Sequence, residues 1–122
     1  MKYQILLEDR NNGRTALIEC PANMLLEELS VKIKLEMQLP LCDYAWHRFL
    51  FKGMIYVVEE HCFSEPWRTY ECTERDEFCY FVSSEEVKLK HVYTTLGSAI
   101  TYHQDGSKKG EHRVRCTLVK RI

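Results

Sequence analysis

The first forty residues of the chain constrain its fold more than any other stretch. Apolar and polar residues alternate from Lys2 to Glu8 and again from Thr15 to Cys20, which is typical of two half-buried strands. Between them, Asn12-Gly13 supplies the two residues with positive φ that a tight hairpin turn requires. The sequence therefore predicts an opening β-hairpin, with Tyr3, Ile5, Leu7, Ala16, Ile18 and Cys20 facing inward.

An amphipathic helix is predicted directly after this hairpin. Pro21 closes the second strand and Asn23 is a suitable N-cap, and Pro40 disfavours helical geometry in the residue before it. The helix is expected to run from about 24 to 37. Apolar residues recur along it at helical spacing, and we expect them to bury against the hairpin: Leu26, Leu29, Ile33 and Met37.

The rest of the chain is predicted to add strands to the same sheet. Segments 46–51 and 54–58 form a second hairpin around Lys52-Gly53, whereas 59–76 has no sustained period and is expected to be irregular, with room for one short element. Further expected elements are a strand at 77–82, a short capped helical turn within 84–93, a strand at 99–103, a loop at 104–110 and a closing strand at 112–119. This order predicts an α+β fold in a single domain, 1–122, with a mixed or antiparallel sheet packed against one main helix.

Charge is unevenly distributed along a chain whose formal net charge is −1 over 122 residues. Segment 59–86, expected to be an acidic insertion, carries a net charge of −7, and the residues from Gly106 onward carry +5. A balanced total predicts no strong overall attraction to nucleic acid or anionic membranes. Two local surfaces of opposite sign are the candidates for binding.

The six cysteines are expected to be reduced thiols in a cytoplasmic protein. No apolar run approaches the length of a membrane span, the amino terminus enters a strand pattern without a signal-peptide core, and a domain of this size needs no disulfide bridges. Cys20 and Cys116 fall on inward-facing strand positions, where a reduced cysteine behaves as a small hydrophobe.

Three segments, in this order, resemble the plasmid pRi Orf-three-like family, a set of mobile-element passenger proteins with no established activity. They are YQILLEDRNNGRTALIECPANMLLEELSVKIKLEMQL, DYAWHRFLFKGMIYV and VKLKHVYTTLGSAITYHQDGSKKGEHRVRCTLVKRI. His47 and Phe49 occupy the family's His-x-Phe positions, and Tyr102 and His112 match positions in its last two strands. The chain departs from the family at Ala45, where the family has a histidine, and at 105–110, which replaces an acidic, tryptophan-bearing loop. The resemblance implies a β-grasp-like fold with extra strands, and it implies no reaction.

Metal binding and catalysis have candidate residues but no recognisable motif. Soft ligands gather within forty residues (Cys42, His47, His61, Cys62, Cys72 and Cys79), yet their spacing lacks the short ligand pairs of structural zinc sites. A thiolate nucleophile would need a histidine beside it, and no local signature surrounds any cysteine. His47 alternates with Phe49 and is expected to be a core histidine. We therefore predict no catalytic residue, metal or cofactor.

Two binding functions remain, from different classes. The first is a non-catalytic protein-interaction module of a mobile element or phage, which inhibits a nucleic-acid-processing or defence enzyme by docking on its basic groove. Its predicted contacts are acidic and aromatic: Glu65, Trp67, Tyr70, Glu71, Glu74, Asp76 and Glu77. The second is a nucleic-acid-binding accessory protein that uses the basic C-terminal strand and its loop, with Tyr102 for stacking: Lys108, Lys109, Arg113, Arg115 and Lys120. A metal- or thiol-dependent enzyme is a third alternative.

Overall fold

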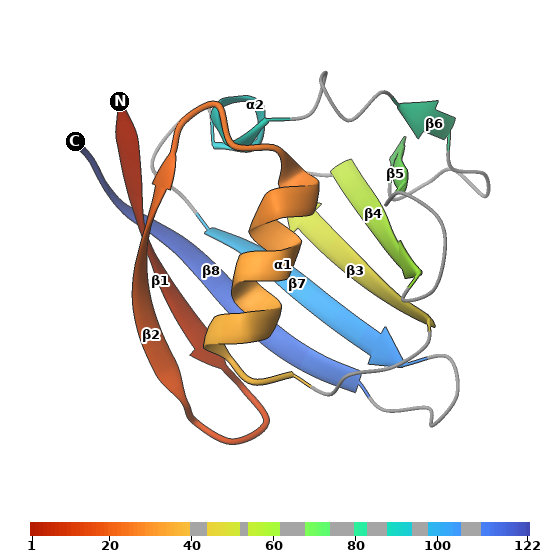
Figure 1. The fold of residues 1–122 in the computed structure, drawn as a ribbon, viewed down its shortest axis with the longest axis horizontal. Coiled ribbons are helices and arrows are strands. Elements are labelled where there is room, and N and C mark those ends of the chain that lie inside the picture. Colours follow the sequence, from red (N-terminus) through yellow and green to blue (C-terminus); the bar gives the residue numbers. More distant parts are fainter. Residues whose placement is uncertain are drawn as a thin grey trace.

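Eight strands form one antiparallel sheet, in the order β2-β1-β8-β7-β3-β4-β5-β6 (Figure 1). The computed structural model describes residues 1–39, 44–51, 54–61, 68–73, 80–82, 88–93, 98–105 and 111–122. The strands are β1 (Lys2–Asp9), β2 (Thr15–Pro21), β3 (Tyr44–Phe51), β4 (Met54–His61), β5 (Arg68–Thr73), β6 (Tyr80–Val82), β7 (Ser98–Asp105) and β8 (Glu111–Arg121). The main helix is α1 (Leu26–Glu36), and α2 (Leu89–Val92) is a single turn. The predicted α+β class is confirmed, and the sheet is antiparallel.

The opening hairpin forms as predicted, but its turn is not the predicted one. β1 pairs with β2 from Lys2↔Pro21 to Glu8↔Thr15. Gly13 has φ of 75°, whereas Asn12 is not among the described residues with positive φ, so the expectation for Asn12 is wrong. Side chains shape the loop instead, because Oδ1 of Asn12 accepts a hydrogen bond from the Arg14 N–H (2.9 Å). A loop of five residues therefore needs only one positive φ.

Helix α1 buries the predicted stripe, and its two ends differ from expectation. Leu26, Leu29 and Ile33 are each at most 1% exposed. The N-cap is Leu25 rather than Asn23, because Glu28 accepts the Leu25 backbone N–H (3.4 Å) as in a capping box. At the other end Gln38 adopts φ of 51° and the Leu39 N–H donates to the Lys34 carbonyl (3.0 Å), which ends the helix before Pro40 is reached.

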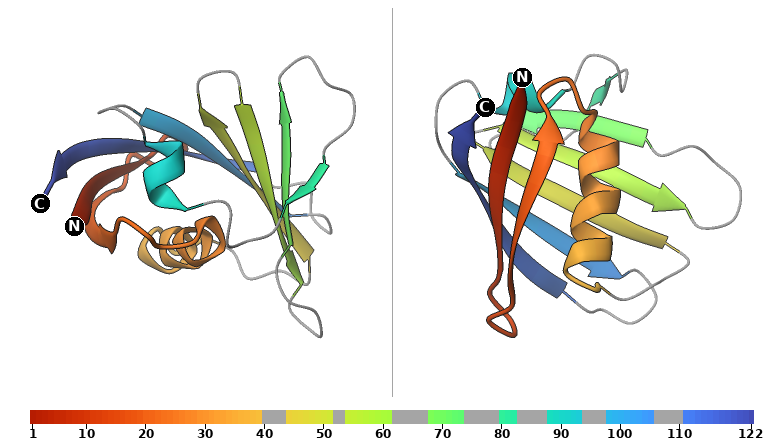
Figure 2. Two further views of the ribbon diagram at one scale, coloured as in Figure 1. Left: turned by 90° about the horizontal axis from the view of Figure 1, so that it is seen from above. Right: turned by 60° about the vertical axis from the view of Figure 1, so that its left-hand side comes forward.

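Both helices lie on the concave face of a strongly curved sheet (Figure 2). We call this the inner face and the opposite one the outer face. The inner-face residues of β1, β2 and β8 and the stripe of α1 form one hydrophobic core, which is continued by Phe49, Val58, Leu89 and Tyr93. The packing of Leu26, Leu29 and Ile33 with Ile5, Leu7 and Ile18 is thereby confirmed. No described helix covers the outer face.

The middle of the chain is more regular than its sequence predicts. The second hairpin is confirmed, with β3 paired to β4 from Tyr44↔His61 to Phe51↔Met54. The start of the stretch 59–76 is more regular than expected, because β4 continues to His61, and the one short element expected there is β5, which pairs with β4 from Met54↔Thr73 to Glu59↔Arg68. Segments 62–67 and 74–76 lie outside the described residues. Pairing to a neighbouring strand satisfies the backbone of β5 although its side chains show no clear alternation. Helix α2 lies within the predicted turn over 84–93, of which 84–87 fall outside the described residues.

Strands β7 and β8 lie between the first and the second hairpin in the sheet, and β8, the last strand of the sequence, pairs with β1, the first. β7 extends to Asp105, so the expected loop over 104–110 begins later than predicted. Near the terminus Arg121 donates to the Tyr93 carbonyl (3.1 Å), and its guanidinium lies 5.7 Å from the centre of the Tyr3 ring. Tyr3 and Tyr93 meet edge to face at 6.4 Å. Arg121 therefore has a structural role and is not an open cation of the basic strand.

Candidate functional site

The structure describes two of the seven predicted acidic and aromatic contacts, and describes them only as strand positions. Glu65, Trp67, Glu74, Asp76 and Glu77 lie outside the described residues. The other two are successive positions of β5, where Tyr70 pairs with Val57 and Glu71 pairs with Tyr56. Because successive residues of a strand point to opposite faces, these two positions belong to different faces of the sheet. What the pairing does establish is that this part of the chain forms one edge of the sheet, with β6 as the last strand.

The predicted basic residues of β8 lie on the outer face. Val114, Cys116 and Leu118 are buried on the inner face, so Arg113 and Arg115 between them project outward. Arg113 is exposed and Arg115 is half-buried, and Lys120 is exposed near the chain end. Lys108 and Lys109 lie outside the described residues. The outer face of β8 thus carries a described part of the predicted nucleic-acid surface.

A cation that the sequence analysis missed lies in line with Arg113. Arg48 on β3 is paired with Tyr102 on β7, and Tyr102 is paired with Arg113 on β8. Arg48 is exposed, and its neighbours His47 and Phe49 are buried on the inner face, so Arg48 projects outward. The order Arg48, Tyr102, Arg113 therefore forms a row across three adjacent strands, which we call the arginine row. Neighbours in such a row lie about 4.5–5.5 Å apart at their Cβ atoms.

Acidic residues offset part of the positive charge of the outer face. Glu8 is paired directly with Arg115 across β1 and β8, so these opposite charges are neighbours on the outer face. A pocket of about 320 Å³ beside the first hairpin turn is lined by Glu8, Asp9, Arg10, Gly13, Thr15 and Arg115. Glu19 is a second exposed carboxylate on β2. The arginine row lies on the other side of β8 from these carboxylates, toward β7 and β3.

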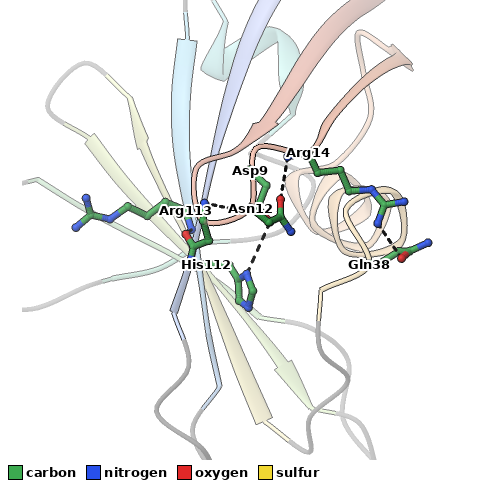
Figure 3. A network of polar contacts seen from close by, with 7 residues as sticks. Asp9, Asn12, Arg14, Gln38, His112 and Arg113 are labelled. Atoms are coloured by element: carbon green, nitrogen blue, oxygen red, sulfur yellow. Dashed lines mark hydrogen bonds and ion pairs between the residues drawn. The ribbon is translucent and has the colours of Figure 1, made fainter.

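A network of polar contacts lies beside the first hairpin turn, at the end of the inner face (Figure 3). The Asp9 side chain has no exposed surface; its Oδ1 accepts the Asn11 N–H at 2.8 Å and its Oδ2 lies 3.7 Å from Nδ1 of His112. Asn11 in turn accepts the Arg113 N–H at 3.2 Å. Arg14 donates to Gln38 at 2.8 Å, which fastens the hairpin turn to the end of α1. The turn is thus held to both β8 and α1.

Two further polar residues, on β3 and β7, are buried on the inner face. His47 and Thr101 both have 0% exposure, and His47 is therefore confirmed as a core residue. In the described part of the chain, Oγ1 of Thr101 makes no hydrogen bond. Buried polar atoms of this kind usually have a partner. The predicted apolar core accordingly ends in a polar cluster near the start of β8 and the end of β7.

The two described cysteine side chains are unsuited to nucleophilic catalysis. Cys20 and Cys116 are both reduced and buried. Burial raises the pKa of Cys116 to about 12, with a further upward contribution from Cys20. The pKa of Cys20 is also raised by burial, and Lys32 partly offsets this. Because the thiolate is the nucleophile, neither group reacts readily near neutral pH.

Of the six candidate zinc ligands in the sequence, the structure describes the side chain of His47 alone. Cys42, Cys62 and Cys79 lie outside the described residues, and His61 and Cys72 are described only as paired backbone positions. Among the side chains that the structure does describe, no three histidine, cysteine or acidic residues are placed to hold a metal ion.

A separate shallow groove of about 480 Å³ runs along α1 beside the exposed Val31 and Leu35.

No helix in the described part of the chain is long and apolar enough to cross a membrane. No protein-family model matches the chain, and neither the curated proteins nor the solved structures contain a match to it.

Proposed function

We propose that this protein is a non-catalytic nucleic-acid-binding module whose contact surface is the outer face of β3, β7 and β8. The observation that carries the proposal is the arginine row, in which Arg48 and Arg113 flank the position of Tyr102 in register. The described helices occupy the other face, so no helix in the described part of the chain covers this surface. A cytoplasmic location is part of the proposal.

The chemistry of the row fits a single-stranded nucleic acid. Guanidinium groups neutralise and hydrogen-bond phosphates, and a tyrosine offers a flat surface on which a base stacks. Sheets that display aromatic residues on one face bind RNA bases in this way. Arg115 and Lys120 extend the positive surface along β8. Glu8 and Glu19 give the surface an acidic border on the side of β1 and β2.

The experiment is a charge reversal of the row with a matched control. In Arg48→Glu/Arg113→Glu, we expect affinity for a single-stranded oligonucleotide to fall at least tenfold at about 50 mM salt, because two phosphate contacts become repulsive. The control, Lys32→Glu/Lys90→Glu, makes the same charge change on α1 and α2 and should bind as the native chain does. Equal weakening in both variants, or no binding by the native chain, would overturn the proposal.

A protein-interaction module is the second candidate, and the edge position of β5 and β6 favours it. An edge strand presents unpaired backbone groups to which a partner's strand can add. Here the partner would be an enzyme with a basic groove, contacted by the acidic segment. Changing Glu71, Glu74 and Glu77 to Lys should abolish association with such an enzyme and spare oligonucleotide binding.

We also propose that the chain belongs to the family that its sequence resembles. Of the residues that carry the resemblance, His47 and Phe49 are buried on β3 and His112 lies on β8, so they belong to strands of the same sheet. We propose membership of the plasmid pRi Orf-three-like family, in a mobile-element or phage context, with a β-grasp-like opening. A matched set of homologous sequences that keep these positions would support it.

A further inference from the structure

Strand β2 is the last strand of the sheet on the side of the first hairpin, and it has one unpaired edge in the described part of the chain. Thr15, Leu17 and Glu19 are exposed along β2, and Leu17 is 56% exposed. An unpaired edge offers backbone N–H and C=O groups to another strand, and proteins usually protect it with charges, prolines or a covering element. An exposed leucine in the middle of such an edge indicates an interaction surface.

The hydrogen bonds at both ends of the first hairpin show which backbone groups of β2 face this edge. The Ala22 N–H donates to the Met1 carbonyl (3.0 Å), and the Asp9 N–H donates to the Arg14 carbonyl (2.8 Å). Residues of an antiparallel ladder alternate between bonding to one neighbour and to the other, and the register has no shift between these ends. The even-numbered residues of β2 therefore bond to β1, and its odd-numbered residues point their N–H and C=O groups away from β1.

This alternation allows β2 to pair with β2 of a second copy about a two-fold axis. In an antiparallel pair centred on Leu17, Leu17 lies opposite itself and Thr15 lies opposite Glu19. All three residues then exchange both backbone hydrogen bonds with their opposites, since all three face the edge. A shift of the register in one direction places Pro21, which has no N–H, opposite Thr15. A shift in the other direction places Glu19 opposite Gly13, in the hairpin turn.

The side chains that meet in this register are compatible. Leu17 is paired with Leu6 on β1, so two copies together form a continuous row of leucines across the outer face. Glu19 meets Thr15, whose hydroxyl can donate to the carboxylate, and no like charges lie directly opposite each other. An interface in which one patch matches itself closes as a dimer and leaves no free edge of the same kind.

Helix α1 runs beside β2 and carries further exposed apolar residues (Figure 2). Its end is held to the hairpin turn by the hydrogen bond between Arg14 and Gln38 (2.8 Å). Val31 and Leu35 are 38% and 70% exposed and line the groove of about 480 Å³. A two-fold axis perpendicular to the sheet keeps the inner faces of both copies on the same side. The exposed sides of the two α1 helices therefore approach each other across the axis, and exposed apolar surface of this kind often marks an interface.

We propose that the protein forms a two-fold homodimer in which the β2 strands of two copies pair antiparallel about Leu17 and join the two sheets into one. The occupant of the edge is a second copy because β2 is complementary to itself in its backbone groups, in its apolar centre and in its charge. The interface is separate from the arginine row, which lies on β3, β7 and β8, so dimerisation and oligonucleotide binding are independent properties.

The test is sedimentation velocity of the full-length protein over a concentration series. We expect the native chain to form a dimer. Leu17→Lys should weaken dimerisation at least tenfold, because it places two ammonium groups directly opposite each other. Val119→Lys is the matched control, because Val119 is a 47% exposed apolar residue of β8, away from the edge, and this variant should dimerise as the native chain does. Circular dichroism of each variant establishes that it is folded.

Cross-linking tests the register. Opposite residues of a hydrogen-bonded pair have Cα atoms about 5.5 Å apart, within the range that a disulfide spans. Under mild oxidation, Leu17→Cys should therefore form more disulfide-linked dimer than the native chain, and Val119→Cys should not. Leu17→Cys adds no charge, so it tests the interface even if Leu17→Lys does not fold.

Three outcomes would overturn the proposal. A native chain that stays monomeric at every concentration would leave the β2 edge to a strand of another protein. A dimer that folded Leu17→Lys leaves unchanged, or that Val119→Lys weakens equally, would have its interface elsewhere. Equal cross-linking of the two cysteine variants would show that the β2 strands do not meet at Leu17.

Discussion

Nδ1 of His112 lies 3.7 Å from Oδ2 of Asp9, and the Asp9 side chain is completely buried. The two residues come from opposite ends of the chain, on β1 and β8, which are adjacent in the sheet. A contact between a buried carboxylate and an imidazole couples the closing strand to the opening one. It also links the first hairpin turn to the start of β8.

A double-mutant cycle measures this coupling. Asp9→Asn and His112→Gln are each expected to destabilise the protein, and the double variant should lose less than the sum of the two. Residues in direct contact typically show interaction energies of about 0.5–3 kcal/mol. Urea denaturation of the four proteins provides the values, and additivity to within about 0.3 kcal/mol would mean that the contact contributes nothing.

Leu29→Ala should destabilise the protein by about 2–5 kcal/mol. The Leu29 side chain is 1% exposed within the core, so its removal leaves a cavity as well as losing buried apolar area. Leu35→Ala is the matched control on the same helix, because Leu35 is 70% exposed and should change stability by no more than about 0.5 kcal/mol. Similar losses in the two variants would contradict the packing of α1.

Gln38→Gly should be more stable than Gln38→Ala by about 1 kcal/mol. Gln38 adopts φ of 51°, a conformation that glycine takes without strain and alanine does not. Both variants lose the Arg14 side-chain hydrogen bond, so the comparison isolates the backbone. Thermal melts of the pair decide the point, and a more stable alanine variant would show that α1 does not end in this way.

The stability of the protein should fall as pH rises above about 9. The folded state keeps the Cys116 proton up to a pKa of about 12, whereas the unfolded chain releases it near the ordinary cysteine pKa of 9.0. The unfolded state therefore binds fewer protons in this window, and each such group lowers the unfolding free energy by about 1.4 kcal/mol per pH unit. Burial also raises the pKa of Tyr93 and Cys20, with the same sign. Cys116→Ala should show a shallower dependence in urea denaturation, and an identical one would contradict the assignment.

Local periodicity accounts for the parts of the fold that the sequence predicts well. The first hairpin, the buried face of α1 and the second hairpin all depend on alternation or helical spacing within a few residues, as at Ile5, Leu29 and Phe49. The turn at Asn12 and the cap at Leu25 depend on individual side-chain hydrogen bonds, which the residue types alone do not specify. β5 forms by pairing with β4, and its own sequence shows too little alternation of apolar and polar residues to predict a strand.

Register between distant strands explains what the sequence analysis missed at the site. Arg48 is a lone cation in an apolar strand, and only its pairing with Tyr102 reveals a row with Arg113. His47 and His103 are likewise far apart in sequence and paired in the sheet.

The salt dependence of oligonucleotide binding is the most direct test of the outer face as a nucleic-acid surface. For single-stranded DNA, the logarithm of the binding constant should fall linearly with the logarithm of salt concentration, by about 0.7 for each phosphate that is neutralised. Arg48→Gln/Arg113→Gln removes two such contacts, so its slope should be shallower by about 1.4 than that of the native chain. An unchanged slope in this variant, or no binding by the native chain at about 50 mM salt, would contradict the account.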